Sequence, residues 1–382
     1  MKEIKNPFII SEKVVPELFC DRKEESQKLC SLIENGNNVV LISHRRVGKT
    51  GLIQYCYDRK QIKSNYLTFY IDILSTNNLQ EFTYLLSREI VSVIRPFGKK
   101  VIDTFLSIVK SLSGKVGYDA VSGTPAISFQ LGEITNPDHT LKEIFEYLSS
   151  AQKPCLVAID EFQQIAKYSD GNVEALLRSH ILQTNNCRFV FSGSERHLLE
   201  EMFISPARPF YNSCALISLN VIERATYIEF IQSMFSKYKK RISKELAERI
   251  YDMFDGITFY VQRICNGVFT LTPEGSKATD EMVSGTLETN LYSYDTIFRE
   301  RLYRLTTRQK ELLFAIASEG KVDRITSREF IQNYALGTSS AVQTSLKALF
   351  KMDLLDKEFG KIFIPEKFFY LWLKKNYLFS RT

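Results

Sequence analysis

Short apolar runs alternate with helical stretches over the first 222 residues of the chain. A run of β-branched, aliphatic or aromatic residues is typical of a buried strand, whereas apolar residues spaced three and four apart are typical of a helix. Five runs predict strands at residues 39–42, 66–72, 155–159, 188–192 and 215–219. This alternation predicts an α/β fold with a doubly wound, mostly parallel sheet.

Helical spacing appears before and between these strands. It predicts helices that follow residue 21 or cover residues 51–59, 79–94, 101–112, 137–150 and 172–183. Asp21 is expected to cap the first helix, with Glu24 three residues later as in a capping box. A region bearing Gly and Ser at 113–124 leads to residues 126–131, which are predicted to form a short strand or one arm of a hairpin.

The first predicted strand ends in a polar loop that closes with Gly48-Lys49-Thr50, just before a helical stretch. Free backbone N–H groups and the positive end of the dipole at such a helix start attract phosphate. Lys49 would reach the β and γ phosphates, and the Thr50 hydroxyl would ligate Mg²⁺. Ser43 stands where the P-loop pattern asks for glycine, so a plain surface loop is the alternative. The residues expected to bind the nucleotide here are Ser43, His44, Arg45, Arg46, Val47, Gly48, Lys49, Thr50 and Gly51.

An acidic pair, Asp160 and Glu161, follows the apolar run at 155–159. A buried parallel strand would deliver both carboxylates at the edge where open α/β sheets bind ligands. Asp160 would hold Mg²⁺ through water, and Glu161 would polarise the attacking water. The alternative is a strand followed by a solvated helix cap. Ser192, at the end of the next strand, would sense the γ-phosphate, although a serine there can also be a simple turn residue.

The pattern becomes wholly helical from residue 223 to about residue 290. A small helical bundle after the last strand would close over the nucleotide as a lid. Arg263 in its third helix either faces solvent or reaches the phosphates, and the spacing does not decide between the two.

The C-terminal part predicts a winged helix-turn-helix. Thr306 or Thr307 caps a helix that runs through Ala317, helices at 327–334 and 339–352 follow, and residues 361–364 read as a strand. The polar residues of the last helix lie opposite Leu346, Leu349 and Phe350, and they are Ser340, Gln343, Thr344 and Lys347. That face would read a DNA major groove. Many winged helices bind protein instead, so both partners stay open.

Composition sets outer limits. A chain of 382 residues is expected to form two or three domains. The net charge is +6, and the segment from Arg299 onward carries 16 Lys and Arg against 9 Asp and Glu. Seven scattered cysteines argue against a disulfide framework and favour a reducing cytoplasm. No apolar run approaches the roughly 20 residues that span a bilayer, so no membrane association is expected.

The order of these motifs resembles the prokaryotic, archaeal-type ATPase family within the AAA+/STAND group of P-loop NTPases. The resemblance is carried by Asn6-Pro7-Phe8, Phe19-Cys20-Asp21-Arg22, Arg45-Arg46-Val47-Gly48-Lys49-Thr50, Ile159-Asp160-Glu161-Phe162-Gln163, Ser192-Gly193-Ser194 and Leu371-Trp372-Leu373. It implies an AAA+-like core at residues 1–222, a helical lid at 223–298 and a winged helix at 299–382. It also implies ATP with Mg²⁺ as ligand, adenine near residues 14–19, and Phe19 and Arg22 among the nucleotide contacts.

Two departures from the family pattern stand out. Gly256-Ile257-Thr258 lacks the proline usual at the start of a lid helix. The loop before the last strand often ends in arginine after Pro-Leu-Tyr, but here Pro209-Phe210-Tyr211 continues into Asn212-Ser213, which leaves Arg208 as the nearby candidate for an arginine finger. The resulting hypothesis is a cytoplasmic ATPase switch with slow turnover, since the transition-state charge is poorly compensated without an arginine from a partner. The alternatives are a nucleotide-gated DNA-binding regulator with little turnover and a protein scaffold. The sequence leaves the oligomeric state open.

Overall fold

The computed structural model describes residues 6–10, 16–112, 115–118, 125–128, 134–358 and 360–378. The chain gathers into two compact units. The sheet unit comprises Ile9–Tyr227 and Gly256–Phe259, and the helical unit comprises Met1–Phe8, Ile228–Asp255 and Tyr260–Thr382. The three-domain division, with boundaries at residues 222 and 298, stays a prediction. Across the described residues, no helix combines the length and apolarity needed to cross a bilayer.

A five-stranded parallel sheet forms the centre of the sheet unit, as the alternating pattern predicts. Its strands lie in the order β2-β5-β6-β1-β7. Their bounds are Val39–Ser43 for β1, Leu67–Asp72 for β2, Cys155–Asp160 for β5, Cys187–Gly193 for β6 and Ala215–Leu219 for β7. All five strands run in one direction, so their carboxyl ends meet at one edge, where Asp72 pairs in register with Asp160.

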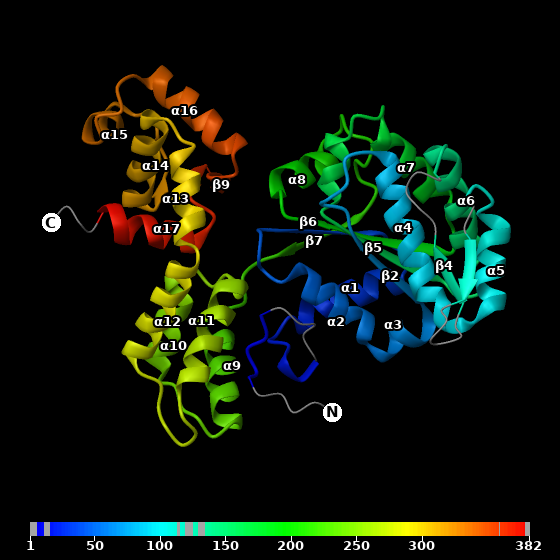
Figure 1. Ribbon diagram of the computed structural model, residues 1–382, viewed down its shortest axis with the longest axis horizontal. Coiled ribbons are helices and arrows are strands. Elements are labelled where there is room, and N and C mark those ends of the chain that lie inside the picture. The colour runs from blue at the N-terminus through cyan, green and yellow to red at the C-terminus, as the bar shows by residue number, and fades with distance from the viewer. Residues whose placement is uncertain are drawn as a thin grey trace. The chain divides into compact units, whose positions relative to one another are not determined.

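Successive side chains along the strands point to opposite faces of the sheet and pack into two separate apolar layers. Val40 and Ile42 of β1 pack into one core cluster, whereas Val39 and Leu41 pack into the other. Figure 1 shows the corresponding helices on the two sides of the sheet. One side carries α1 (Lys23–Glu34), α2 (Lys49–Asp58) and α3 (Lys60–Asn65). The other carries α4 (Leu79–Ile94), α5 (Lys99–Ile108), α6 (Pro137–Ser150), α7 (Val173–Gln183) and α8 (Arg196–Ile204). A sheet buried on both faces explains why its strands read as continuous apolar runs.

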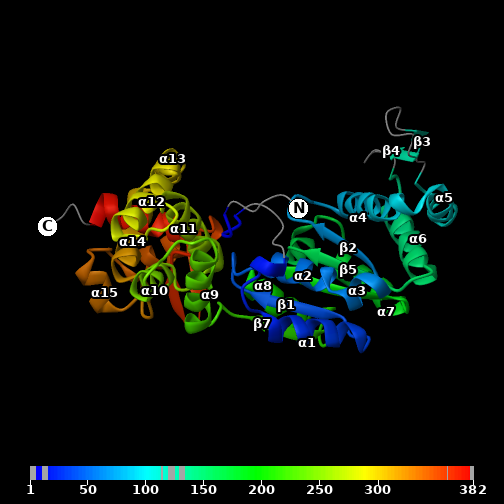
Figure 2. The same ribbon diagram turned by 90° about the horizontal axis from the view of Figure 1, so that it is seen from below.

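An antiparallel hairpin lies within the insertion between β2 and β5. Its strands are β3 (Lys115–Tyr118) and β4 (Pro125–Ser128), and both views place it beside α5 (Figures 1 and 2). The predicted hairpin arm is confirmed over residues 126–128, and residues 129–131 lie outside the described part of the chain.

The predicted cap of α1 is wrong. Asp21 does not cap the helix: the N-cap is Arg22, which makes no side-chain capping bond, and both residues have positive φ angles of 51° and 62°. Two successive left-handed residues turn the chain sharply, which is costly for side chains other than glycine. Arg22 is 4% exposed, and its side chain makes the contacts described below.

The end of β6 is closely packed. A Cβ atom on Gly193 would lie 1.8 Å from Gln163 Oε1 and 2.6 Å from Leu199 Cδ1, so any larger residue would force these two buried side chains to shift. This close approach lets the short 3₁₀ segment Phe162–Lys167, which follows β5, lie directly against the strand that carries Ser192.

Five helices form the first part of the helical unit, as the wholly helical pattern predicts. They are α9 (Arg224–Lys237), whose first turn belongs to the sheet unit, α10 (Lys244–Met253), α11 (Thr258–Leu271), α12 (Asp280–Ser293) and α13 (Asp295–Tyr303). The fully buried Phe8 ring contacts Phe235 and Phe269 at centroid distances of 5.5 and 5.8 Å. The Asn-Pro-Phe segment therefore anchors the N-terminal end of the chain to these helices.

The rest of the helical unit is a winged helix, as predicted. Its helices are α14 (Thr307–Glu319), α15 (Arg328–Asn333), α16 (Ser339–Lys351) and α17 (Lys367–Leu373). Its small antiparallel sheet has the order β8-β10-β9, formed by Lys321–Val322, Lys361–Phe363 and Asp356–Glu358. Thr306 and Gln309 form a reciprocal capping box on α14, which decides between the two predicted caps.

Helix α16 presents the predicted polar face. Its buried side is formed by Val342, Ser345 and Leu349, and its exposed residues include Ser340, Gln343, Thr344 and Lys347. The Thr344 hydroxyl donates to the Ser340 carbonyl at 3.0 Å, whereas the Gln343 amide and the Lys347 ammonium are exposed on the same face.

Candidate nucleotide-binding site

The loop between β1 and α2 has the backbone of a phosphate-binding loop. Gly48 adopts a φ of 103° as the N-cap of α2, and Arg46 is left-handed with a φ of 67°. The first N–H groups of the helix have no partner within it and can therefore face an anion. Lys49, the first residue of α2, folds back over the loop, and its Nζ donates to the His44 carbonyl at 3.3 Å. Burial lowers the pKa of Lys49, whereas the nearby Asp160 and Glu161 carboxylates raise it.

The Asp160 carboxylate is the point where the loop and the sheet meet. Its Oδ2 accepts from the Thr50 hydroxyl at 2.9 Å and from the Tyr70 hydroxyl at 2.7 Å. Its Oδ1 accepts from the Ser192 hydroxyl at 2.6 Å and from the Glu161 backbone N–H at 3.0 Å. The structure thus brings together Thr50, Asp160 and Ser192, which sequence reasoning had placed at one site.

Tyr70 is a member of this site that sequence reasoning missed. Burial and the adjacent Asp160 carboxylate both raise the pKa of its phenol, so the hydroxyl keeps its proton and donates it to Asp160. In the sequence, Tyr70 looks like any aromatic residue of a strand. The neighbouring position of β2 and β5 was the missing information.

Glu161 lies one residue further along and is held separately. It has a φ of 57°, which turns its side chain away from the strand direction. Its Oε2 accepts from the Gln163 amide at 2.6 Å, from the Ser194 hydroxyl at 2.7 Å and from the Ser194 N–H at 3.2 Å. Gln163 and Ser194 belong to the motifs quoted above, but no role had been assigned to them.

The donors at this site fit a magnesium ion. Mg²⁺ prefers oxygen ligands and commonly takes one or two from protein, with water and phosphate supplying the others. The Thr50 hydroxyl and the Asp160 carboxylate are adjacent oxygen donors, and Asp160 is 5% exposed. Among the described residues no cluster of three His, Cys, Asp or Glu side chains forms. An ion here would therefore depend on a nucleotide for part of its coordination.

Arg22 supports the loop from beneath. Its Nη1 donates to Glu25 at 2.8 Å, and its Nη2 donates to the Val47 carbonyl at 3.2 Å. A guanidinium that is held in this way braces the loop backbone. Its contact to the loop is therefore a protein contact rather than a ligand contact, and a role for Arg22 toward a nucleotide stays a prediction.

Phe19 lies against the start of α2. Its ring stacks on Tyr55 at a centroid distance of 4.3 Å, and its Cε2 would lie 3.6 Å from a Cβ atom on Gly51. The absence of a side chain at Gly51 therefore lets the ring approach the helix that follows the loop. Residues 14 and 15, expected near adenine, lie outside the described part of the chain.

The remaining loop residues have protein partners of their own. The Ser43 hydroxyl donates to the His44 carbonyl at 2.9 Å, and His44 Nε2 lies 3.3 Å from Arg196 Nη1. Arg45 and Arg46 are exposed. Arg196, at the start of α8, connects this helix to the loop and was not foreseen from the sequence.

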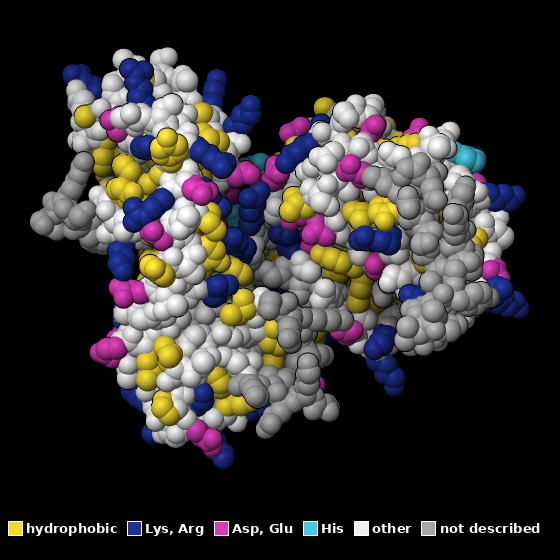
Figure 3. Space-filling view, in the orientation of Figure 1, with side chains coloured by type: hydrophobic (Ala, Val, Ile, Leu, Met, Phe, Trp, Pro, Cys, Tyr) yellow, Lys and Arg dark blue, Asp and Glu magenta, His cyan; other side chains and the backbone are white. Residues whose placement is uncertain are grey.

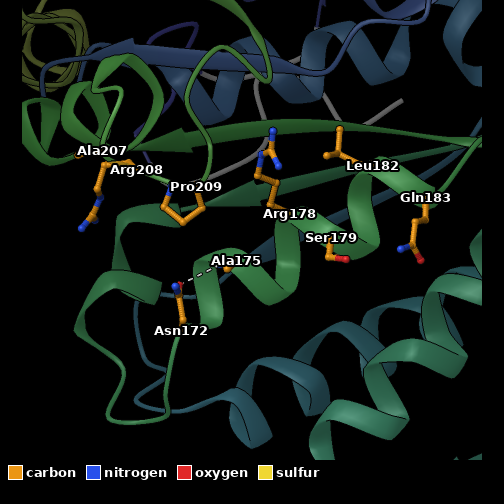
Figure 4. A pocket seen from close by; sticks show the side chains of 9 residues that line it. All are labelled: Asn172, Ala175, Arg178, Ser179, Leu182, Gln183, Ala207, Arg208 and Pro209. Carbon is orange, nitrogen blue, oxygen red and sulfur yellow. Dashed lines mark hydrogen bonds between the residues drawn. The ribbon is translucent and has the colours of Figure 1, made fainter.

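The two other candidate arginines are engaged elsewhere. Arg208 Nη2 lies 2.6 Å from Glu174 Oε1, and Arg208 Nη1 lies 3.7 Å from Glu201 Oε1. Figure 4 shows Arg208 beside a pocket lined by α7 and residues 207–209. The structure thus places its guanidinium against α7 and α8, and an arginine-finger role stays a prediction. Arg263 Nε donates to Asn290 of α12 at 2.6 Å.

The parallel sheet, the loop that starts α2 and the carboxylate at the end of β5 define a P-loop NTPase that carries a winged helix. A family model described as an ATPase domain predominantly from Archaea matches residues 19–264, and a model for a probable winged helix domain matches residues 296–375. The chain therefore belongs to this family of archaeal-type ATPase domains, as its motifs had indicated, and it carries an ATP-binding, ATPase-like domain.

The chain is also similar to several known proteins. An uncharacterized ATP-binding protein of Methanocaldococcus jannaschii is 24% identical over 270 residues, which cover 62% of this chain and 68% of the relative. The structure of a Walker-type ATPase of Pyrococcus abyssi aligns over 96% of this chain and 99% of its own, with a TM-score of 0.64 and 22% identity. The ORC2 protein of Aeropyrum pernix, solved with ADPNP and ADP, covers 96% of both chains, with a TM-score of 0.59 and 13% identity. The two solved structures are similar to this chain in fold.

Replacing Tyr70 by Phe removes one donor from the buried Asp160 carboxylate. A hydrogen bond to a charged group contributes about 1.5–3 kcal/mol, so we expect the free energy of unfolding to fall by about that amount. Urea unfolding of the full chain would measure the change. Tyr66→Phe, at a half-buried position just before β2, is the matched control and should leave the midpoint unchanged. Equal midpoints for the two variants would contradict a structural role of the Tyr70 hydroxyl.

Proposed function

We propose that this chain is a slow, Mg²⁺-dependent ATPase whose nucleotide state acts as a conformational switch on its winged helix. The observation that carries the proposal is the hydrogen bond of 2.9 Å from the Thr50 hydroxyl to Asp160. It joins the residue that follows the loop lysine to the carboxylate at the end of β5, which is the pairing that a nucleotide-bound magnesium ion requires.

Phosphate binding would depend on the start of α2. The N–H groups at Gly48 and beyond, together with the Lys49 ammonium, offer positive charge to the β and γ phosphates. Bound Mg²⁺ would neutralise further phosphate charge beside Thr50 and Asp160. The His44 carbonyl, which Lys49 contacts at 3.3 Å, would lose this donor when Lys49 turns to phosphate.

Glu161 is the residue that would take the proton of the attacking water. The Gln163 amide and the hydroxyl and backbone N–H of Ser194 donate to its Oε2. Its Oε1 would therefore face a water molecule. These hydrogen bonds fix the direction of the carboxylate. Ser192 is fully buried and donates to Asp160, so it would respond to the γ-phosphate through this carboxylate rather than by direct contact.

We expect slow turnover because Arg208, the candidate arginine finger, is engaged elsewhere in the protein. Phosphoryl transfer spreads negative charge over the γ-phosphoryl oxygens, and an arginine that neutralises it accelerates the reaction by about 10³–10⁵-fold. Arg208 is ion-paired with Glu174. We therefore infer that a second copy or another partner has to supply this charge for fast turnover.

The start of α11 is where the loop could act on the winged helix. The Phe259 N–H donates to the Arg46 carbonyl at 3.2 Å, and the Arg46 guanidinium lies over the Phe259 ring at 4.7 Å. The Thr258 hydroxyl donates to the Val47 carbonyl at 3.3 Å. Two carbonyls of the loop therefore accept hydrogen bonds from the first turn of this helix.

The next residue, Tyr260, carries the contacts to the winged helix. Its hydroxyl donates to Glu366 at 2.9 Å and accepts from the Lys367 N–H at 3.1 Å, at the start of α17. Lys367 Nζ also lies 2.6 Å from Asp255 Oδ2. Because Phe259 and Tyr260 share a peptide bond, a change in the loop backbone can be passed to α17 without any intervening element.

Two substitutions test the ATPase proposal. Lys49→Ala should weaken ATP binding by at least about tenfold, because the phosphates lose their charged side-chain donor. Glu161→Gln should keep ATP affinity but lower turnover by about 10²-fold or more, because it removes the proton acceptor. Calorimetric titration and phosphate release measure the two effects. Lys63→Ala, an exposed position on α3, serves as control. Unchanged ATP affinity in Lys49→Ala would contradict the proposal.

Tyr260→Phe tests the switch. It removes the hydroxyl that joins α11 to Glu366 and leaves the Lys367 N–H without this partner. ATP affinity should stay within about twofold of the parent chain. Amide exchange at the start of α17 should become faster and no longer differ with and without ATP. Tyr303→Phe, at a position 87% exposed, should preserve the ATP-dependent difference. A full ATP-dependent difference in Tyr260→Phe would rule out this route.

A nucleotide-gated DNA-binding regulator is the second candidate. The observation in its favour is the exposed polar face of α16 within a winged helix. Figure 3 shows Lys and Arg side chains on the winged-helix part of the chain, with hydrophobic side chains between them. Such a mixed surface suits phosphate contacts as well as a protein partner.

Lys347→Ala separates these partners. If α16 binds DNA, affinity for duplex DNA should fall with rising salt, and the variant should show a salt slope smaller by about 1. Mobility shifts across a salt series measure both quantities. Lys244→Ala, on the exposed face of α10, is the control. Equal DNA affinity in Lys347→Ala and the parent chain would instead favour a protein partner.

A further inference from the structure

Two cysteines meet in the apolar layer where α1 packs against α2. Cys30 of α1 and Cys56 of α2 place their Sγ atoms 2.7 Å apart. Both belong to the apolar cluster on the α1–α2 side of the sheet, with exposures of 3% and 0%. A disulfide bond is about 2.05 Å long, so the pair needs an approach of less than about 1 Å to form one.

The surroundings make the two sulfurs chemically different. The hydrogen bond from Cys56 and the nearby Arg59 guanidinium lower the pKa of Cys30 to about 7, although burial opposes the shift. The same contact and burial raise the pKa of Cys56. A thiolate at Cys30 beside a protonated thiol at Cys56 is the arrangement of an attacking and a resolving cysteine.

The other cysteines are less reactive by the same measure. Burial raises the pKa of Cys20, Cys155 and Cys214 to about 12, and it also raises the pKa of Cys187 and Cys265. All seven cysteines are thiols in this structure. Thiolate character thus favours Cys30 as the attacking sulfur, and Cys56 Sγ already lies 2.7 Å from it.

We propose that Cys30 and Cys56 form a reversible disulfide when the protein meets a peroxide. The Cys30 thiolate attacks one peroxide oxygen and breaks the O–O bond, which yields a sulfenic acid at Cys30 and releases hydroxide. The Cys56 sulfur then attacks Cys30 Sγ and displaces the sulfenic oxygen, which leaves as water with the Cys56 proton. For hydrogen peroxide, two thiols are oxidised and one peroxide is reduced to two waters. A dithiol reverses the bond by exchange.

The disulfide would stabilise the folded region around the loop without changing the conformation of the loop. The cysteines enclose β1 and the whole phosphate-binding loop, so the bond restricts the unfolded chain around the site. Because the two sulfurs already touch, α1 and α2 need little rearrangement. We therefore expect oxidation to raise stability while leaving ATP affinity within about twofold.

The experiment treats the full chain with a small excess of hydrogen peroxide, alkylates the remaining thiols in denaturant and maps the peptides by mass spectrometry. The expected product is a linked peptide pair containing Cys30 and Cys56, lighter by two hydrogens than its reduced parts. The unfolding midpoint should rise by about 5 °C and return after dithiothreitol.

Cys30→Ser and Cys56→Ser should each abolish the linked pair and the peroxide-dependent rise, whereas Cys214→Ser should keep both. The comparison is made within each variant, with and without peroxide, so a loss of basal stability does not affect it. Quantitative alkylation of both cysteines after peroxide, or a bridge to a different cysteine, would overturn the proposal. So would a linked pair in which the midpoint does not rise.

Discussion

The buried Asp160 carboxylate is the constraint on which the site depends. A charge taken out of water is costly unless hydrogen bonds replace its hydration. Here the hydroxyls of Thr50, Tyr70 and Ser192 and one backbone N–H supply that replacement. The donors come from α2, β2 and β6, so one carboxylate on β5 fixes three neighbouring elements. The hydrogen bonds that compensate the buried carboxylate are therefore the same contacts that assemble the site.

Most of the fold could be predicted because burial determines the pattern. Strands that are covered on both faces must be continuously apolar, and amphipathic helices must repeat their apolar residues every three or four positions. The helices at 79–94 and 137–150 and the strand at 215–219 match the structure residue for residue. The phosphate loop and the acidic pair were also identified, since their chemistry is written in consecutive residues.

The parts that sequence reasoning missed depend on distance in the fold. Tyr70 reaches Asp160 because β2 lies beside β5, and Ser194 reaches Glu161 because β6 lies on the other side. Asp21 is a residue type that often caps helices, but a tertiary contact decides the local backbone here. The left-handed turn at residues 21 and 22 gives up the cap and sends the Arg22 guanidinium to the Val47 carbonyl.

The turn before α11 shows how a departure from the expected family pattern is accommodated. Thr258 stands where the resemblance led us to expect a proline, and its hydroxyl donates to the Val47 carbonyl. The same carbonyl accepts from Arg22, so both flanks of the loop converge on one backbone oxygen. The turn thereby keeps contact with the loop by a side-chain hydrogen bond, and Tyr260 two residues later continues toward α17.

The most direct test of this account is a calorimetric titration of ATP into the parent chain and into Asp160→Asn, each with Mg²⁺ and with a chelator. Asparagine keeps the shape of the side chain but removes its charge, and a circular dichroism spectrum would confirm folding. The account predicts that Mg²⁺ strengthens ATP binding to the parent chain and has little effect on the variant. An equal gain from Mg²⁺ in both proteins would contradict it.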